Sequence, residues 1–232
     1  FSDGLGSTIL KLKEEEVAGI NDKLQLSKAE NKYQNLLREK FLKKGITLNS
    51  PQTVNFSYDT KISRDVQIGS FCHFGKKVVI KSGVKIGNNC SIEDSIICEE
   101  AVLGPFSRLR NNNYVGKKSK IGNFVELKKT YIGNNSKVNH LAYIGDAFIG
   151  SNTNIGAGTI TCNYDGKKKN VSKIGNNVFI GSNCSIIAPI KIANDCFVAA
   201  GSTISKNLLN KDFSIARARQ KIVRKGRDKF LK

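Results

Sequence analysis

The chain has 232 residues, 39% of them hydrophobic, and carries 38 Lys and Arg against 19 Asp and Glu, a formal charge of +19. This hydrophobic content suffices for a packed core and argues against a disordered chain. The sequence contains neither an apolar run of about 18 residues nor a signal-peptide pattern, so we expect no membrane span and a cytoplasmic location. It begins at Phe1 and lacks Met, which predicts a piece of a longer protein.

The positive charge suits a polyanionic partner, which could be nucleic acid, a nucleotide cofactor or a sugar phosphate. Dense clusters occur at Lys167, Lys168 and Lys169 and in the tail that begins at Arg217. Lysines elsewhere fit a solvated surface. The clusters lack the interleaved aromatic side chains that stacking on bases favours, so no nucleic-acid partner is predicted.

One helix is predicted ahead of the main domain, over residues 27–44. Ser27 and Glu30 match a capping box, and Gly45 would end the helix. The apolar stripe of this helix, which predicts a packing or docking face, comprises Ala29, Tyr33, Leu36, Leu37 and Phe41. The segment before it includes Gly4-Leu5-Gly6, which lacks the strand–turn–helix context of a phosphate loop.

An apolar residue recurs every six positions from Ile62 to Ile204. The period shifts by single-residue deletions before Ile97, Ile132 and Ile149, and by a seven-residue insertion before Ile174. The series has twenty-four positions, of which only Thr161 is not apolar.

A six-residue period is neither helical nor a two-residue alternation, so it counts one side of a prism: a short strand and then a turn. Three sides make a coil of eighteen residues, and twenty-four positions give about eight coils. Each coil buries its apolar residues only by stacking on its neighbours. The sequence therefore predicts an all-β parallel β-helix, preceded by one α-helix; the period alone does not fix its handedness.

Two further columns of residues keep the same register. Glycine often follows the apolar residue, where a corner would need a small residue or a positive φ. Small or β-branched residues stand two positions before it, and they include Cys72, Cys90, Cys184 and Cys196. With Cys98 and Cys162, these are predicted to be reduced, buried thiols, since no metal-ligand pattern is present.

Interruptions of the repeat are the natural places for chemistry, because a unit that only packs has no reason to be interrupted. The longest interruption is residues 162–170, with an Asp-Gly turn and three lysines. Only two histidines occur, and His140 stands where Asn139 replaces a corner glycine. On the residues alone, His140 fits either a structural residue or a general base.

Four segments carry a resemblance to a known family: residues 104–110, 122–129, 140–146 and 154–166. They resemble the acetyltransferase half of the bacterial bifunctional N-acetylglucosamine-1-phosphate uridylyltransferase/glucosamine-1-phosphate N-acetyltransferases, over residues 17–217. The resemblance implies a left-handed β-helix, a homotrimer with sites between subunits, and acetyl transfer from acetyl-CoA to the amine of glucosamine-1-phosphate. The product would serve UDP-N-acetylglucosamine synthesis.

The same resemblance implies roles for individual residues. His140 matches the general base and Glu126 a carboxylate near it. The matches to sugar-phosphate contacts are Arg110, Lys128, Tyr143, Asn154 and Lys169. The matches to acetyl-CoA contacts are Ala157, Asn163, Tyr164, Ser182, Ala200 and Arg217. His140 would free the amine to attack the thioester directly, with the backbone N–H of Ala157 as a candidate oxyanion donor; a nucleophilic Cys162 is the alternative.

The resemblance also implies a division of the chain. Residues 1–21 match the junction with a nucleotidyltransferase domain that this chain lacks, and residues 22–50 a linker helix. Residues 51–206 would form the acetyltransferase β-helix, and residues 207–232 a basic tail. Mg²⁺ is expected only where the nucleotidyltransferase domain is present. Asn21 is the one residue of this chain that matches a Mg²⁺ ligand of that domain.

Two alternatives use the same prism. A basic binding module would recognise nucleic acid or an acidic surface, and a metal-dependent hydratase would need several histidines at each site.

Overall fold

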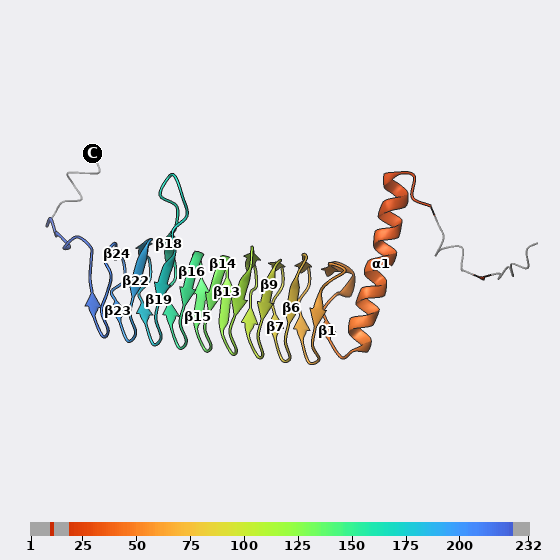
Figure 1. Ribbon diagram of the computed structural model, residues 1–232, viewed down its shortest axis with the longest axis horizontal. Helices are drawn as coiled ribbons and strands as arrows, with labels where there is room; N and C mark the ends of the chain where they lie inside the picture. The colour runs from red at the N-terminus through yellow and green to blue at the C-terminus, as the bar shows by residue number, and fades with distance from the viewer. Residues whose placement is uncertain (1–9, 12–18, 225–232) are drawn as a thin grey trace, which may run out of the picture.

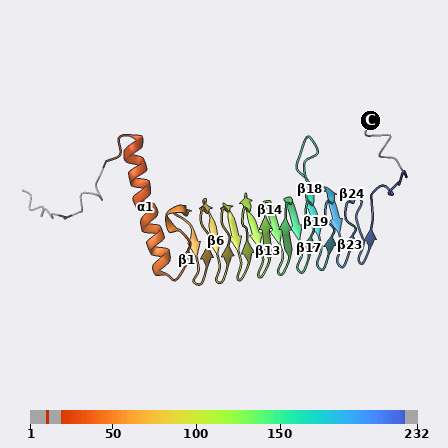
Figure 2. The same ribbon diagram turned by 180° about the vertical axis from the view of Figure 1, so that it is seen from behind.

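The computed structural model of the chain describes residues 10–11 and 19–224. Short parallel strands wind into one long prism, with helix α1 (Lys23–Lys43) standing across one end and an arm projecting between β18 and β19 (Figure 1). Figure 2 shows the same arrangement from behind. Within the described residues, no helix combines the length and the hydrophobicity that crossing a bilayer requires.

The strands lie on three faces, which we number one to three. Face one is a ten-stranded sheet of β1 (Thr47–Leu48), β4 (Gln67–Ile68), β7 (Lys85–Ile86), β10 (Val102–Leu103), β13 (Lys120–Asn123), β15 (Lys137–His140), β17 (Asn154–Ile155), β20 (Phe179–Ile180), β23 (Phe197–Val198) and β25 (Phe213–Ser214). Face two holds β2 (Asn55–Phe56), β5 (His73–Phe74), β8 (Ser91–Ile92), β11 (Arg108–Arg110), β18 (Ile160–Cys162), β21 (Ser185–Ile187) and β24 (Thr203–Ile204). Face three holds β3 (Lys61–Ile62), β6 (Val78–Ile80), β9 (Ser95–Ile97), β12 (Asn113–Val115), β19 (Ser172–Ile174) and β22 (Ile190–Ile192). The long strands β14 (Glu126–Ile132) and β16 (Tyr143–Ile149) turn a corner and serve faces two and three. A 3₁₀ turn, η2 (Pro51–Thr53), precedes β2.

Each strand pairs in parallel with the strand one turn before and one turn after it. Ile121, for example, pairs with Leu103 on one side and Val138 on the other. This register confirms the predicted all-β parallel β-helix. The prism has about nine turns where the sequence predicted eight, because β1 and β2 lie ahead of Ile62 and β25 lies after Ile204, so the series omits three sides.

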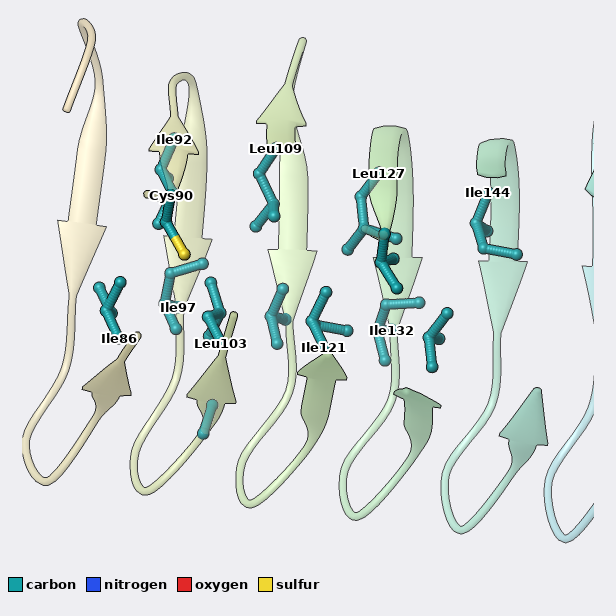
Figure 3. Packing of buried hydrophobic residues seen from close by; sticks show 14 of the residues in the cluster. Ile86, Cys90, Ile92, Ile97, Leu103, Leu109, Ile121, Leu127, Ile132 and Ile144 are labelled. Carbon is teal, nitrogen blue, oxygen red and sulfur yellow. The ribbon is translucent and has the colours of Figure 1, made fainter. Parts of the chain in front are cut away.

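The core is a set of rows of inward side chains, as the six-residue period predicted. Ile92, Leu109, Leu127 and Ile144 come from successive turns and are all 0% exposed (Figure 3). The four cysteines predicted to face inward, Cys72, Cys90, Cys184 and Cys196, are buried, and all six cysteines are free thiols. Since every turn shares its rows with two others, burial is continuous along the prism.

The recurring glycines serve close packing between turns rather than a positive φ. A Cβ on Gly133 would lie 2.5 Å from the carbonyl carbon of Gly150 in the next turn. The positive φ values fall mostly two residues later and mostly on other residue types, such as Asn135 at 57° and Asn152 at 56°. The sequence prediction therefore located the crowded corner but not the left-handed residue.

Helix α1 begins earlier than predicted. Asp22 is its N-cap and accepts a hydrogen bond from the backbone N–H of Gln25 at 2.7 Å, so the expected cap Ser27 lies inside the helix. The buried face also differs: Leu37 and Phe41 are buried as predicted, whereas Tyr33 and Leu36 are 43% and 56% exposed.

Two polar residues of α1, Gln34 and Arg38, are buried where the prediction placed Tyr33 and Leu36. Gln34 donates to the carbonyl of Phe56 at 2.8 Å and accepts from its N–H at 2.9 Å, while Arg38 donates to the carbonyl of Val54 at 2.9 Å. These side chains satisfy backbone groups of the first turn that a preceding turn would otherwise bind.

The paired strands extend beyond residues 51–206 at both ends. Strand β1 pairs with β4, β25 pairs with β23, and Leu208 bridges to Ile192. Residues 207–214 therefore belong to the prism and not to a free tail. Most of the junction expected over residues 1–21, and the last eight residues of the tail, lie outside the described residues.

Candidate active site

Four of the predicted site residues lie on neighbouring turns of face two. The register aligns Arg108, Glu126 and Tyr143 in one outward row and Arg110, Lys128 and Gly145 in the next. Strands β11, β14 and β16 thus bring Arg110, Glu126, Lys128 and Tyr143 together on one face. The ring of Tyr143 lies over Gly145, where a Cβ would meet the phenol oxygen at 2.5 Å.

Glu126 forms an ion pair with Arg110. The Arg110 Nε to Glu126 Oε1 distance is 2.6 Å, and the two side chains are 27% and 29% exposed. A short, half-buried pair fixes the guanidinium in direction and leaves its two Nη groups for another anion. Glu126 is therefore bound to Arg110, and the side chain that contacts His140 is a different one.

A second, buried pair lies beneath this surface. Lys128 Nζ is 2.9 Å from Asp146 Oδ2, with side chains 7% and 6% exposed, and Asn163 donates to the same oxygen. The hydrogen bond to Asp146 raises the pKa of Lys128. Burial alone would raise the pKa of Asp146, but the hydrogen bonds from Lys128 and Asn163 outweigh it and lower that pKa. Asp146 belongs to this group of contacts, and the sequence reasoning missed it.

The insertion at residues 162–170 forms a narrow hairpin arm. Tyr164 and Lys169 bridge across it, and the N–H of Asn170 donates to the carbonyl of Asn163 at 2.7 Å. At its tip the Asp165 carboxylate accepts from the N–H groups of Lys168 and Lys167 at 2.8 Å and 2.9 Å. These two bonds, with one from the Asn170 side chain, lower the pKa of Asp165 to about 2. The predicted Asp-Gly turn is confirmed.

The arm brings Lys169 back to face two, beside Lys128. The neighbouring ammonium of Lys128 lowers the pKa of Lys169, because two adjacent positive charges disfavour each other. Arg110, Lys128 and Lys169 supply three positive charges, and Glu126 and Asp146 only two negative ones. The cluster therefore has a surplus positive charge that an anion such as a phosphate would balance.

His140 lies at the corner between faces one and two, at the end of β15. It is exposed, and its Nδ1 lies 2.6 Å from Oδ1 of Asn123 on the preceding turn. The sequence reasoning also missed Asn123, although it stands at the same place in its turn as His140: each comes two positions after a buried apolar residue of face one.

The same corner continues as a column of small residues. Ala157, Ser182 and Ala200 each follow a face-one residue by two positions, and those face-one residues pair in register, Ile155 with Ile180 and Ile180 with Val198. Backbone bonds join the column: the N–H of Asn183 donates to Ala157 at 2.7 Å and that of Gly201 to Ser182 at 2.8 Å. Val138 also pairs with Ile155, so His140 heads this column one turn before Ala157.

Arg217 lies at the far end of the column, where it donates from Nη1 to the carbonyl of Ala200 at 2.8 Å.

Three predicted site residues lie elsewhere. Asn154 faces outward on face one, between Lys137 and Phe179, and Tyr164 is 60% exposed on the arm. Asn21 lies just before the N-cap of α1, a helix that stands at the opposite end of the prism from β24 (Figure 1). Among residues 10–11 and 19–224, no three His, Cys, Asp or Glu side chains form a metal-binding group.

The fold and the repeats define a hexapeptide-repeat protein. The family model described as bacterial transferase hexapeptide (six repeats) matches residues 59–94 and 172–206. The chain is 46% identical to the bifunctional protein GlmU of Zymomonas mobilis subsp. mobilis over 220 residues, which are 95% of this chain and 49% of that protein. It is 47% identical to GlmU of Wolbachia pipientis wMel over 206 residues, 89% of this chain and 48% of that one.

The chain thus belongs with the hexapeptide-repeat half of the GlmU proteins, and it spans about half the length of the curated relatives that it matches. This confirms the predicted resemblance.

Two solved structures share the fold. LpxA from Acinetobacter baumannii superposes with a TM-score of 0.52 at 17% identity, over 72% of this chain and 69% of that one. LpxA from Bacteroides fragilis 9343, a UDP-N-acetylglucosamine acyltransferase, gives 0.54 at 18%, over 69% of each chain.

Proposed function

We propose that this chain is an N-acetyltransferase that moves the acetyl group of acetyl-CoA to the amine of glucosamine-1-phosphate. The observation that carries the proposal is the corner line on which His140 and the small residues Ala157, Ser182 and Ala200 follow one another. Small side chains leave room for a thin pantetheine arm, and the line ends at a candidate base beside a cationic cluster. Homology to one half of the bifunctional GlmU proteins supports the same activity.

The sugar phosphate would bind to the surplus charge of face two. Arg110 and Lys169 would contact its phosphate, with Lys128 beneath them, and Tyr143 and Asn154 would contact the sugar. In this proposal Glu126 orients Arg110, which differs from the catalytic role implied by the resemblance. Acetyl-CoA would contact Ala157, Ser182, Ala200 and Arg217, with Asn163 and Tyr164 at the arm.

The reaction would then be a direct transfer. His140 removes a proton from the sugar ammonium, and the freed amine forms a bond to the thioester carbonyl. The tetrahedral oxyanion accepts a hydrogen bond, for which the backbone N–H of Ala157 is our candidate donor. The carbon–sulfur bond breaks, the imidazolium gives its proton to the thiolate, the new amide nitrogen releases its surplus proton to water, and N-acetylglucosamine-1-phosphate and CoA leave. Because Cys162 takes no part, no acyl-enzyme forms.

The test mixes the protein with glucosamine-1-phosphate and acetyl-CoA and follows the release of CoA. CoA is best quantified by chromatography, because a thiol reagent would also react with protein thiols such as the half-buried Cys162. Release that depends on both substrates supports the proposal; no release, or equal release by His140→Ala, would overturn it. A second incubation with UTP and Mg²⁺ should yield no pyrophosphate if the nucleotidyltransferase half, of which residues 1–21 would be the remnant, is lacking.

We also infer a homotrimer whose sites lie between subunits. Asn154 faces away from the cluster of its own chain, and the arm projects from the prism (Figure 1). Both suit a site that a neighbouring subunit completes. In trimers assembled from a one-to-one mixture of His140→Ala and Asn154→Ala chains, random assortment should restore about a quarter of the wild-type sites. No restoration after co-refolding would assign both residues to the site of one chain.

A further inference from the structure

At the corner that carries His140, the strand pairing with the preceding turn continues further than at the other corners of face one. Strands β13 and β15 are four residues long, while the other eight strands of this face have two residues each. Their pairing continues to Asn123 and His140, and the N–H of Leu141 donates to the carbonyl of Asn123 at 3.1 Å. The backbone therefore holds these two side chains side by side.

A glycine makes this closeness possible. The space that a Cβ on Gly122 would fill is occupied by the carbonyl of Asn139, so any other residue there would push the two turns apart. Asn123 follows directly and is half-buried, whereas His140 is exposed. The histidine ring thus has one fixed contact towards the preceding turn and an open side towards solvent.

The fixed contact is a hydrogen bond in which only one partner can donate. The Asn123 Oδ1 atom lies 2.6 Å from His140 Nδ1, and an amide oxygen only accepts. Nδ1 must therefore carry the proton, which leaves the lone pair on Nε2. Glu126, the carboxylate that the resemblance implies near the base, is bound to Arg110 at 2.6 Å. The partner of the histidine is thus a neutral amide, which fixes the tautomer and places no negative charge beside the ring.

We infer that Asn123 is a positioning residue that holds His140 in its Nδ1–H tautomer, so that Nε2 is free to accept a proton. The use of Nε2 as a base rests on the proposed acetyl transfer, whereas the tautomer is a property of the free protein. The two can therefore fail separately.

The tautomer can be measured directly, because the chain has only two histidines. In a His73→Gln variant with ¹⁵N-labelled histidine, every imidazole signal comes from His140. Above the pKa of the ring, we expect a protonated Nδ1 and an unprotonated Nε2. In Asn123→Ala the signals should move towards the Nε2–H form that free imidazole side chains favour. An Nε2–H ring in the His73→Gln protein would overturn the inference, whether or not the enzyme transfers acetyl groups.

Kinetics then separates positioning from folding. Asn123→Ala should lower kcat about tenfold with little change in the KM for acetyl-CoA, as expected when the orientation of a base is lost. Asn123→Asp keeps an acceptor, so it should retain the Nδ1–H tautomer and shift the acidic limb of the pH–rate profile upward, because a carboxylate stabilises the imidazolium. Asn139→Ala, which changes the asparagine on the other side of the same corner, should alter neither.

Equal losses in Asn123→Ala and Asn139→Ala, or an unshifted pH profile in Asn123→Asp, would contradict a positioning role. If the tautomer is as expected but no acetyl transfer occurs in any variant, the proposed function fails while the role of Asn123 in fixing the ring stands.

Discussion

The first turns of the prism and the turns around His140 share one interior and differ in their exterior. Phe74 and Val138 occupy equivalent inward positions and are both 0% exposed, yet the nearby histidines have different surroundings. His73 lies on a regular face-two strand between Asn55 and Ser91. His140 lies at a corner, bonded to Asn123 and at the head of a column of small residues. The repeat thus supplies a scaffold, and chemistry depends on what is added outside it.

The largest expected effect tests this difference between the two histidines. His140→Ala should lower the rate of acetyl transfer by about 10² to 10⁴, the range typical of a lost general base, while His73→Ala should leave it unchanged. The measurement is CoA release at saturating substrates. Equal losses in both variants would mean that the difference in surroundings has no catalytic meaning.

The second effect concerns stability and compares a buried with an exposed ion pair. Lys128→Met leaves Asp146 buried without its partner and should lower the free energy of unfolding by about 3–5 kcal/mol. Lys118→Met breaks the exposed pair with Glu100, whose nitrogen–oxygen distance is 3.6 Å, and should cost less than about 1 kcal/mol. Urea denaturation of both variants gives the comparison, and similar midpoints would show that the pair beneath the site is not a structural one.

The same pair should also respond to pH. The pKa of Asp146 is lowered in the folded protein, so its contribution to stability is complete above the unfolded value of about 4 and is lost as the pH falls through the folded value. The pKa of Lys128 is raised, so its contribution is complete below about 10.4 and is lost as the pH rises through the folded value. The gap in urea midpoint between wild type and Asp146→Asn should therefore be constant near neutral pH and narrow below about pH 4. A gap that widens in acid would contradict the sign of the shift.

The smallest effect concerns the arm. Asp165→Ala removes the acceptor of two backbone bonds and one side-chain bond at the tip, and should raise the KM for acetyl-CoA several-fold by loosening Asn163 and Tyr164. Lys167→Ala keeps that turn and should leave the KM near the wild-type value. If Lys167→Ala has the larger effect, the arm works through its charge and not through its shape.

The sequence alone predicted the interior better than the exterior. Inward residues repeat every six positions because all turns share one geometry, so the period predicted both the prism and its core. In the first turn, Leu48 falls outside the period because η2 lengthens its step to Phe56 to eight residues, whereas Phe56 keeps the six-residue step to Ile62 and was simply missed. The buried face of α1 was partly wrong, since a helix that caps a β-helix must satisfy backbone groups, and Gln34 and Arg38 do this where an apolar stripe cannot.

The residues of the candidate site were likewise only partly predictable from the sequence. Arg110, Glu126, Lys128, Tyr143 and His140 could be placed from family resemblance and period together, because register alone brings them to adjacent turns. Asp146 and Asn123 could not, since their importance depends on which side chain each one meets. The only available signal was their location in segments 140–146 and 122–129, which carry the resemblance.

The cap formed by α1 also restricts how such a molecule can grow. A β-helix ends in unpaired backbone groups that invite another chain to add to them. Here Gln34 and Arg38 already bind the groups of Val54 and Phe56, so end-to-end polymerisation is blocked on that side. Further turns would have to enter within the stack or at its other end, as units of about eighteen residues, and each turn added after β15 would lengthen the corner column by one position.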